Sequence, residues 1–171
     1  MALSENALTG APVTSFSSDG VLTFGGSGDE RVVTMAALGT SLYATRFSYS
    51  SGAGIDGGSG FAPQGSKDAF ILALNALDGT PITTFSSDGI QSFGGSSDED
   101  GNGIAVFGQY AWVSGYSGSA DAKVGGAGPS YDASSFGGFL LSLKRATGES
   151  TQPPQIQSQP TANPNPSFLA P

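Results

Sequence analysis

A long stretch of this chain occurs twice, and the repeat limits the folds that the chain can adopt. Residues 14–26 read TSFSSDGVLTFGG, and residues 83–95 read TTFSSDGIQSFGG, at an offset of 69 residues. Extended on both sides, the alignment holds 16 identities in 24 positions without a gap. The same offset relates FILAL at 70–74 to FLLSL at 139–143. A register kept over this length predicts a repeated structural unit rather than a recurring short motif.

Each copy of the repeat contains four short segments with the composition of β-strands. The segments are rich in β-branched and aromatic residues and are bounded by Gly, Ser or Asp. No window shows the periodicity of an amphipathic helix. The expected strands are 21–24, 32–38, 41–48 and 68–75 in the first copy, and 90–93, 103–107, 110–117 and 137–144 in the second. The sequence therefore predicts an all-β chain with four antiparallel strands in each copy.

Both faces of the predicted sheets carry apolar side chains. Phe70, Leu72 and Leu74 share one face of their strand, because alternate residues of a strand point to the same side. Tyr43 in the first copy corresponds to Trp112 in the second. A small sheet with two apolar faces has to be covered on both sides. Repeated four-stranded sheets of this kind are typical of the blades of a β-propeller.

Three motifs of the second copy resemble a known repeat. DAFILALNALDG, FGGSSDEDGNGIAV and AWVSGYSGSAD resemble the SBBP-type β-propeller repeat of secreted and cell-surface bacterial proteins, and TTFSSDGIQSFGG is also similar to the delta-60 type of propeller repeat. The resemblance covers residues 7–148. The first copy departs from it at 31–34, where RVVT replaces the DGNG of 100–103. The resemblance implies propeller blades and an extracellular or cell-surface location, and it brings no catalytic residues to this chain.

The repeat and the composition divide the chain into four parts. Met1–Glu5 takes the place of the FILAL strand but reads MALSE, as expected of a worn strand. The C-terminal part is rich in Pro, Gln, Asn and Ser, a composition that favours extended chain over a packed core. We expect a strand stub at 1–9, two propeller-like blades of about 69 residues at 10–78 and 79–148, and an extended arm or linker at 149–171. Apolar anchors in that arm are Ile156, Phe168 and Leu169.

Two blades do not make a closed propeller. Closed rings have ~4–8 blades. An open pair would expose apolar faces and unpaired strand edges. Three arrangements remove this exposure. The chain is a piece of a longer propeller, two to four copies close a ring, or copies stack head to tail into a filament.

Charge and composition exclude several classes of function. The chain has 14 acidic and six basic residues, a net charge of −8, which disfavours binding to nucleic acid or to anionic membranes. It lacks cysteine and histidine, so thiolate metal sites and the commonest general base are missing. No nucleophile elbow, phosphate-binding loop, long apolar span or signal peptide is recognisable. We therefore expect a protein that is not an enzyme and is not inserted in a membrane.

One segment has the spacing of calcium ligands. Asp98, Asp100 and Asn102 are followed by Gly103, which matches the first half of a calcium loop. The position that needs Glu is Gln109, and the first copy has no counterpart of Asp100 or Asn102. An ordinary turn that enters a strand explains the pattern more simply. No other cofactor is expected.

Two long loops, at 49–66 and 118–135, contain aromatic residues that we expect to be exposed. These are Phe61 and Tyr131, candidates for contacts with glycans or with partner proteins. The aromatic residues of the third strands, Tyr43 and Trp112 among them, could also stack on sugars, although packing between blades explains them more simply.

The sequence thus favours a non-catalytic structural module. The leading hypothesis is a subunit of an extracellular or surface assembly, joined through blade faces and the C-terminal arm by self-association or by neighbouring protein subunits. One alternative is a lectin-like module that closes an oligomeric ring and binds glycans. The other is an accessory subunit of a large multiprotein complex.

Overall fold

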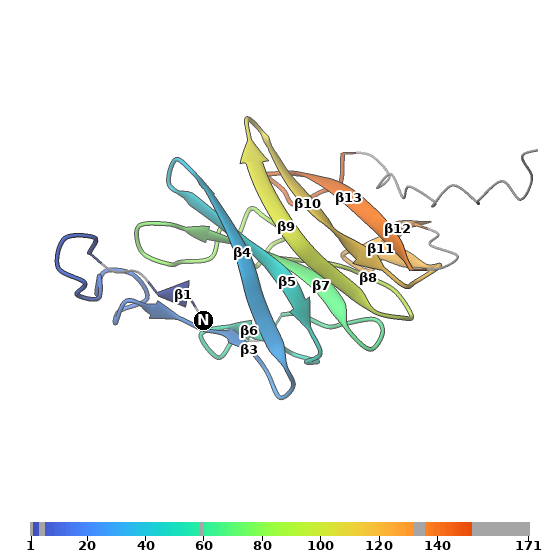
Figure 1. The fold of residues 1–171 in the computed structure, drawn as a ribbon, viewed down its shortest axis with the longest axis horizontal. Coiled ribbons are helices and arrows are strands. Elements are labelled where there is room, and N and C mark those ends of the chain that lie inside the picture. Colours follow the sequence, from blue (N-terminus) through green and yellow to red (C-terminus); the bar gives the residue numbers. More distant parts are fainter. Residues whose placement is uncertain (1, 4–5, 59, 132–135, 152–171) are drawn as a thin grey trace, which may run out of the picture.

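The computed structural model describes residues 2–3, 6–58, 60–131 and 136–151, which form β-strands and contain no α-helix. All pairs of neighbouring strands are antiparallel, so the expected all-β class is confirmed (Figure 1). The strands are β1 (Ala2–Leu3), β2 (Val21–Leu22), β3 (Phe24–Gly25), β4 (Glu30–Leu38), β5 (Ser41–Ser48), β6 (Gly54–Ile55), β7 (Asp68–Asn75), β8 (Ile90–Gly94), β9 (Glu99–Phe107), β10 (Tyr110–Ser117), β11 (Ala122–Val124), β12 (Ala127–Tyr131) and β13 (Gly137–Lys144).

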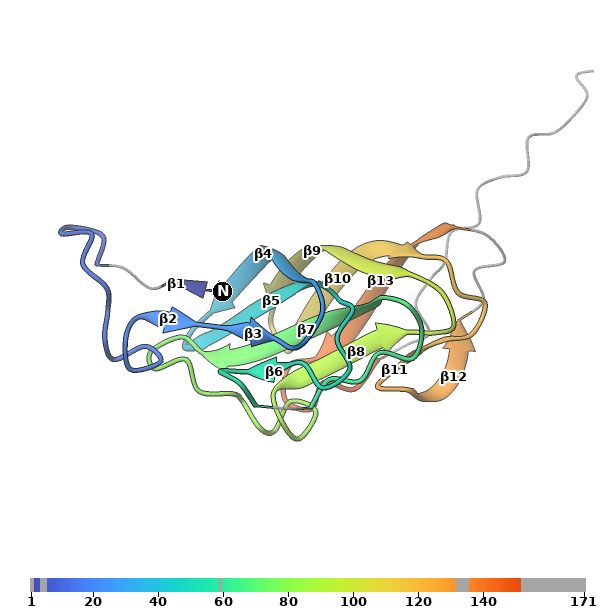
Figure 2. The ribbon, with the colours of Figure 1, turned by 90° about the horizontal axis from the view of Figure 1, so that it is seen from below.

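The strands form one large sheet, one sheet of three strands and two small pairs. The large sheet has six strands in the order β12-β11-β8-β7-β5-β4, and the three-stranded sheet has the order β13-β10-β9. The pairs are β1-β2 and β3-β6. Figure 2 shows β4 and β9 on one side of the molecule and β6, β8 and β11 on the opposite side. In each of these strand orders the first and last strands do not pair, so no sheet of the described residues closes on itself.

The division into sheets differs from the two four-stranded sheets expected from the sequence. The strand after the second Asp-Gly turn, β8, pairs back with β7, from Leu72↔Ile90 to Ala69↔Phe93. The turn at Asp88 and Gly89 reverses the chain, so β8 returns beside the strand that precedes it. The chain crosses to the three-stranded sheet only after Gly94. The unit of pairing is therefore shifted by one strand relative to the sequence repeat.

The repeated SSDG turn has the same backbone conformation in both places. The Asp side chain accepts a hydrogen bond from the backbone N–H two residues later, from Val21 N to Asp19 Oδ1 and from Ile90 N to Asp88 Oδ1, each at 2.8 Å. Consecutive serines with positive φ are uncommon, since this region is sterically unfavourable for residues with a Cβ. The φ angles are Ser17 49°, Ser18 65° and Gly20 86°, against Ser86 54°, Ser87 63° and Gly89 82°.

Two apolar clusters lie on the two faces of the large sheet. Along β7, the residues Ala69, Ile71 and Ala73 belong to the first cluster, and the residues between them belong to the second, as alternation requires. The first cluster joins the large sheet to the three-stranded sheet and includes Tyr43, Phe85, Phe93, Ala111, Val113, Phe139, Leu141 and Leu143. The second joins it to β2, β3 and β6 and includes Phe16, Leu22, Phe24, Phe61, Phe70, Leu72 and Leu74.

The described strands therefore form three layers, with the large sheet in the middle. We call the layer of the two small pairs, β1-β2 and β3-β6, the first layer. Its strand pairing repeats a pairing found within the middle layer. β1 pairs with β2 as Ala2↔Leu22 and Leu3↔Val21. Adding 69 to each number gives Ile71↔Gln91 and Leu72↔Ile90, which are observed pairs of β7 and β8. The first layer thus holds β2 and β3 where the middle layer holds β8, and only the two residues of β1 where the middle layer holds the whole of β7.

Candidate interaction surfaces at the two ends of the sheet stack

The outer face of the three-stranded sheet exposes several large apolar side chains. Ala111 and Val113 of β10 are fully buried against the large sheet, so Tyr110 and Trp112 point outward. Their rings meet edge to face with centroids 6.2 Å apart. Leu140 lies on the same outer face, on β13 opposite Ser114. Because neighbouring strands present these side chains together, they form one apolar surface, which we call the C-terminal face.

The corresponding face of the middle sheet is covered by another sheet, whereas the C-terminal face is exposed. Tyr43 is 1% exposed and Ile71 is 0% exposed, because the three-stranded sheet covers them. Their counterparts 69 residues later, Trp112 and Leu140, are 40% and 49% exposed. The residue types are equally apolar, so the difference comes from position in the stack. Within the described part of the chain, no layer covers the C-terminal face.

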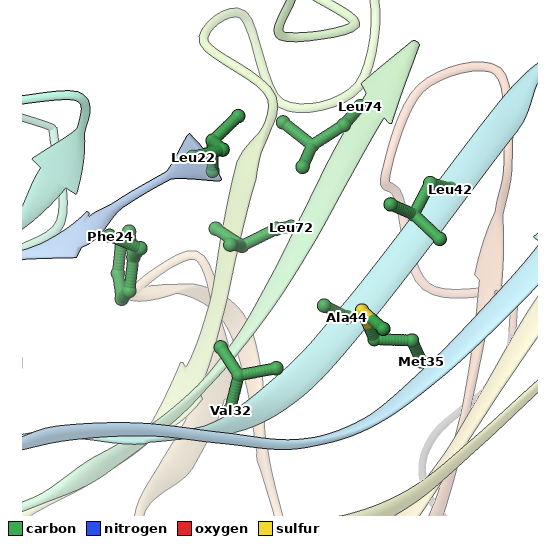
Figure 3. A pocket seen from close by; sticks show the side chains of 8 residues that line it. All are labelled: Leu22, Phe24, Val32, Met35, Leu42, Ala44, Leu72 and Leu74. Carbon is green, nitrogen blue, oxygen red and sulfur yellow. The ribbon is translucent and has the colours of Figure 1, made fainter. Parts of the chain in front are cut away.

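The opposite end of the stack has a shallow apolar groove, shown in Figure 3. Leu22 and Phe24 form one wall, and Met35 of β4 lies on the other side, where it is 53% exposed. The counterpart of Met35 in the three-stranded sheet, Ile104, is packed against the first apolar cluster. The groove, which we call the N-terminal groove, is lined by Leu22, Phe24, Val32, Met35, Leu42, Ala44, Leu72 and Leu74.

One edge of β13 has little pairing in the described structure. Its inner edge pairs with β10 along its whole length, from Tyr110↔Lys144 to Ser117↔Gly137. On the other edge, the described backbone pairing consists of the bridge Leu143↔Ser150 and the hydrogen bonds from Lys144 N to Glu149 O and from Thr151 N to Ser142 O. The corresponding strand β7 has a full partner, β8, over residues 69–72. The backbone edge at 138–141 is therefore open for a further strand within the residues described.

A buried group of charges joins the large sheet to the three-stranded sheet. Lys67 Nζ lies 3.7 Å from Asp100 Oδ2 and 3.9 Å from Asp98 Oδ2, and it donates a 2.7 Å hydrogen bond to Tyr116 Oη. Arg46 Nε lies 3.4 Å from Asp100 Oδ1. The Lys67 ammonium also lies 4.8 Å from the centroid of the Phe47 ring. These contacts fix the position of β9 against the large sheet.

A second buried carboxyl group, Asp68, is poorly satisfied. Gln64 N donates to Asp68 Oδ2 at 2.9 Å, but Asp68 Oδ1 has no hydrogen-bond partner. Burial raises the pKa of Asp68 to about 6, and the negative charge of Glu99 adds to this rise against the backbone hydrogen bonds. Glu99 is better satisfied, because it accepts hydrogen bonds from Gly95 N, Ser117 Oγ and Ser119 N.

The residues with the spacing of a calcium loop lie in or next to β9 and do not surround a common point. Asp100 is buried and ion-paired, Asn102 is exposed, and Asp98 shares Lys67 with Asp100. The ammonium group of Lys67 thus takes the place beside these carboxylates that a cation would need. The described residues contain no group of three or more acidic side chains arranged to hold a metal ion. Calcium binding here stays a prediction, and the geometry does not favour it.

The loop aromatics are buried, so the expectation that they are exposed was wrong. Phe61 is packed against Phe24 and Phe70, and Tyr131 against Phe93. Short strands explain the error: β6, β11 and β12 arise within or beside these loops and turn the rings inward. The other predicted contact residues, Ile156, Phe168 and Leu169, lie outside the described residues.

Sequence reasoning missed several residues of the two surfaces. The sequence analysis relates FLLSL at 139–143 to FILAL and does not single out Leu140. Period-2 alternation could have shown that Leu140 points the other way. Met35 and the groove around it gave no sequence signal, because Met35 is exposed where none of the described strands covers it.

Comparisons with protein-family models, curated proteins and solved structures found no match to this chain. In the described ranges, no helix is long and apolar enough to cross a membrane.

Proposed function

We propose that this protein is a non-catalytic assembly module, a subunit of an extracellular or surface structure. The observation that carries the proposal is the exposure of Trp112 and Leu140 on a sheet face whose counterpart inside the molecule is fully buried. Apolar groups gathered on one sheet face favour contact with another protein, because burying them removes apolar surface from water.

The arrangement of the layers also supports assembly. Among the described residues, both faces of the middle sheet are covered, no layer covers the C-terminal face, and β2 and β3 fill only part of the N-terminal groove. In the interpretation we favour, the sheets are blades of a propeller-like stack, and both end blades need neighbours. Stacking through these two ends joins subunits in one direction and produces a ring or a filament.

The tryptophan fluorescence of the intact chain provides a direct test. Trp112 is the one tryptophan of the sequence and lies on the C-terminal face. If this face binds another subunit, the emission of Trp112 shifts to shorter wavelength and becomes less accessible to a soluble quencher as protein concentration rises. Emission that stays constant from nanomolar to high micromolar concentration, with the chain folded and no partner added, contradicts self-assembly through this face.

A matched pair of variants shows whether the signal comes from the C-terminal face. Leu140→Asp places a charge on that face and should abolish the concentration dependence. Leu77→Asp makes the same substitution at an exposed leucine in the turn between β7 and β8, and it should leave the dependence unchanged. Equal effects of the two variants would mean that added charge alone prevents association.

Glycan binding is a second candidate, because Tyr110 and Trp112 present two exposed rings side by side. Aromatic rings of this kind stack on the apolar faces of sugars. The same fluorescence signal separates the two candidates. A shift caused by oligosaccharides at low protein concentration favours glycan binding, and a shift caused by protein concentration alone favours assembly.

A further inference from the structure

We infer that residues 21–25 of a second copy pair with the open edge of β13 and complete the three-stranded sheet. This inference rests on the proposed function and names the partner: an identical chain, joined head to tail. The pairing follows the register of β7 and β8 shifted by 69 residues, so Leu140 pairs with Leu22 of the second copy and Leu141 with its Val21.

The first argument is the backbone. β13 corresponds to β7, and β2 with β3 corresponds to β8, which pairs with β7 over four residues. In the isolated chain these two segments lie in the outer layers and do not pair with each other (Figure 1). Among the described residues, β13 has no strand partner at 138–141 on its outer edge, and the edge of β2 is paired by the two residues of β1, which β13 of a second copy would replace. The two edges lie in opposite outer layers of one chain. Their backbone N–H and C=O groups can therefore pair with each other when the edges belong to two different copies.

The second argument is the side chains. Inside the chain, Tyr43 and Ile71 pack toward Ile104, Ala111 and Val113. The same arrangement between copies brings Trp112 and Leu140 onto the N-terminal groove of the second copy, where Met35 is exposed and Leu42 is half-buried at the matching positions. One placement therefore pairs the open strand edge and covers both apolar surfaces.

The third argument comes from the residues that correspond, 69 positions away, to the buried charges Lys67 and Asp100. Between the two sheets of one chain, Lys67 faces Asp100. The counterparts between copies are Phe136, which is exposed and contacts the ring of Tyr116, and Arg31, which is also exposed. A guanidinium group beside aromatic rings is attractive, so the junction between copies replaces an ion pair with a cation–π contact.

The chain that follows β13 is a poor substitute for a second copy. The positions that correspond to β8 are 159–163, which read QPTAN where β8 reads IQSFG. Proline lacks the N–H that a strand ladder needs, and the apolar alternation of β8 is absent. Residues 21–25 read VLTFG and have the pattern of β8.

Cysteine cross-linking tests the register, and the native chain offers a clean background because it contains no cysteine. Chains carrying Leu22→Cys are mixed with chains carrying Leu140→Cys and oxidised gently, after circular dichroism has shown that both variants are folded. The expected result is a disulfide between unlike chains, identified by mass spectrometry of the linked peptides. Cross-strand neighbours are close enough for this bond.

The control is Ser114→Cys mixed with Leu22→Cys. Ser114 is exposed on the same face and lies opposite Leu140, one strand further from the open edge. Two strand spacings are too long for a disulfide, so this mixture should remain unlinked. Equal linkage at 114 and 140 overturns the register. Absence of linkage at 140 in particles larger than one chain overturns the strand pairing and leaves the proposed function intact, whereas a monomer under all conditions contradicts both.

Strand β1 provides an independent measurement without cysteine. β1 pairs with the edge of β2 that β13 of a second copy would use. A chain that begins at Asn6 lacks β1 and should associate at lower concentration than the full chain. Weaker association of this shortened chain would mean that the edge of β2 is not the contact, and it would overturn the inference.

Discussion

At the scale of single residues, Asp68 should make the stability of the protein depend on pH. Its pKa is raised to about 6 by burial, so the native state binds its proton more tightly than the unfolded chain does. Because the pKa of Asp68 is raised in the native state, the contribution of Asp68 to stability is greatest below its unfolded pKa. This contribution is lost as the pH rises through the native pKa. The ionised Asp68 then costs about 2–3 kcal/mol relative to its protonated form.

The variant Asp68→Asn removes this cost at neutral pH. Between pH 4 and pH 8, we expect the free energy of unfolding of the variant, relative to the wild type, to rise by about 2 kcal/mol, measured by urea denaturation. Asp121→Asn is the control of opposite sign, because hydrogen bonds from Ser96 lower the pKa of Asp121. The account is contradicted if Asp68→Asn changes stability equally at both pH values.

Lys67 provides a second test at this scale. Lys67→Met leaves the buried Asp100 without its ammonium partner and should reduce the free energy of unfolding by about 2–4 kcal/mol at neutral pH. The matched control is Lys144→Met, which breaks an exposed ion pair with Glu149 and should have little effect on stability, because solvent screens this pair. Comparable losses in the two variants would show that the buried charges do not hold β9 in place.

At the scale of elements, the packing of β9 on β5 depends on a glycine. A Cβ at position 101 would clash with Oγ1 of Thr45, a buried side chain whose hydroxyl donates a hydrogen bond to Phe70 O. A β-branched side chain in a strand has little freedom to move away. We therefore expect Gly101→Ala to lower the free energy of unfolding by about 1–3 kcal/mol.

The neighbouring residue supplies the control for this substitution. Asn102→Ala changes the next residue of β9, which is exposed, and should be nearly neutral when both variants are compared with the wild type by thermal unfolding. If Gly101→Ala is equally neutral, β9 does not approach β5 as closely as described.

The elements also show how far sequence reasoning could go. The expected strands all correspond to observed ones within a few residues, because alternation and turn residues are local signals. The strand that pairs with β8 could not be predicted from local sequence, because the pattern of β8 fits the first strand of one unit or the last strand of the unit before it. The chain reversal at Gly89 places β8 beside β7. The short strands β6, β11 and β12 lack a pattern, so the burial of Phe61 and Tyr131 could not be predicted.

The candidate surfaces were predictable only in part. The alternation of residues in the sequence shows that Trp112 and Tyr43 lie on corresponding faces of their sheets. It does not show that one is covered and the other exposed, since that depends on which layer stands at the end of the stack. The exposure of Met35 likewise depends on which of the described strands lie over β4 rather than on the residues next to it in sequence.

At the scale of the whole molecule, two opposing effects determine whether copies associate. The apolar end surfaces favour contact, and a net charge of −8 per chain opposes it. Salt screens the repulsion between chains more than it weakens burial of apolar surface. We expect association to strengthen as ionic strength rises, measured by sedimentation at fixed protein concentration. Weaker association at high salt would point instead to contacts made mainly by opposite charges.

The mass of the particle in solution tests the central claim most directly. Light scattering on the intact chain, from low to high micromolar concentration, compares this mass with the 17.0 kDa of one chain. The proposed assembly predicts particles of two or more chains, either a discrete ring or a polydisperse filament. A folded particle of 17.0 kDa at every concentration would contradict it.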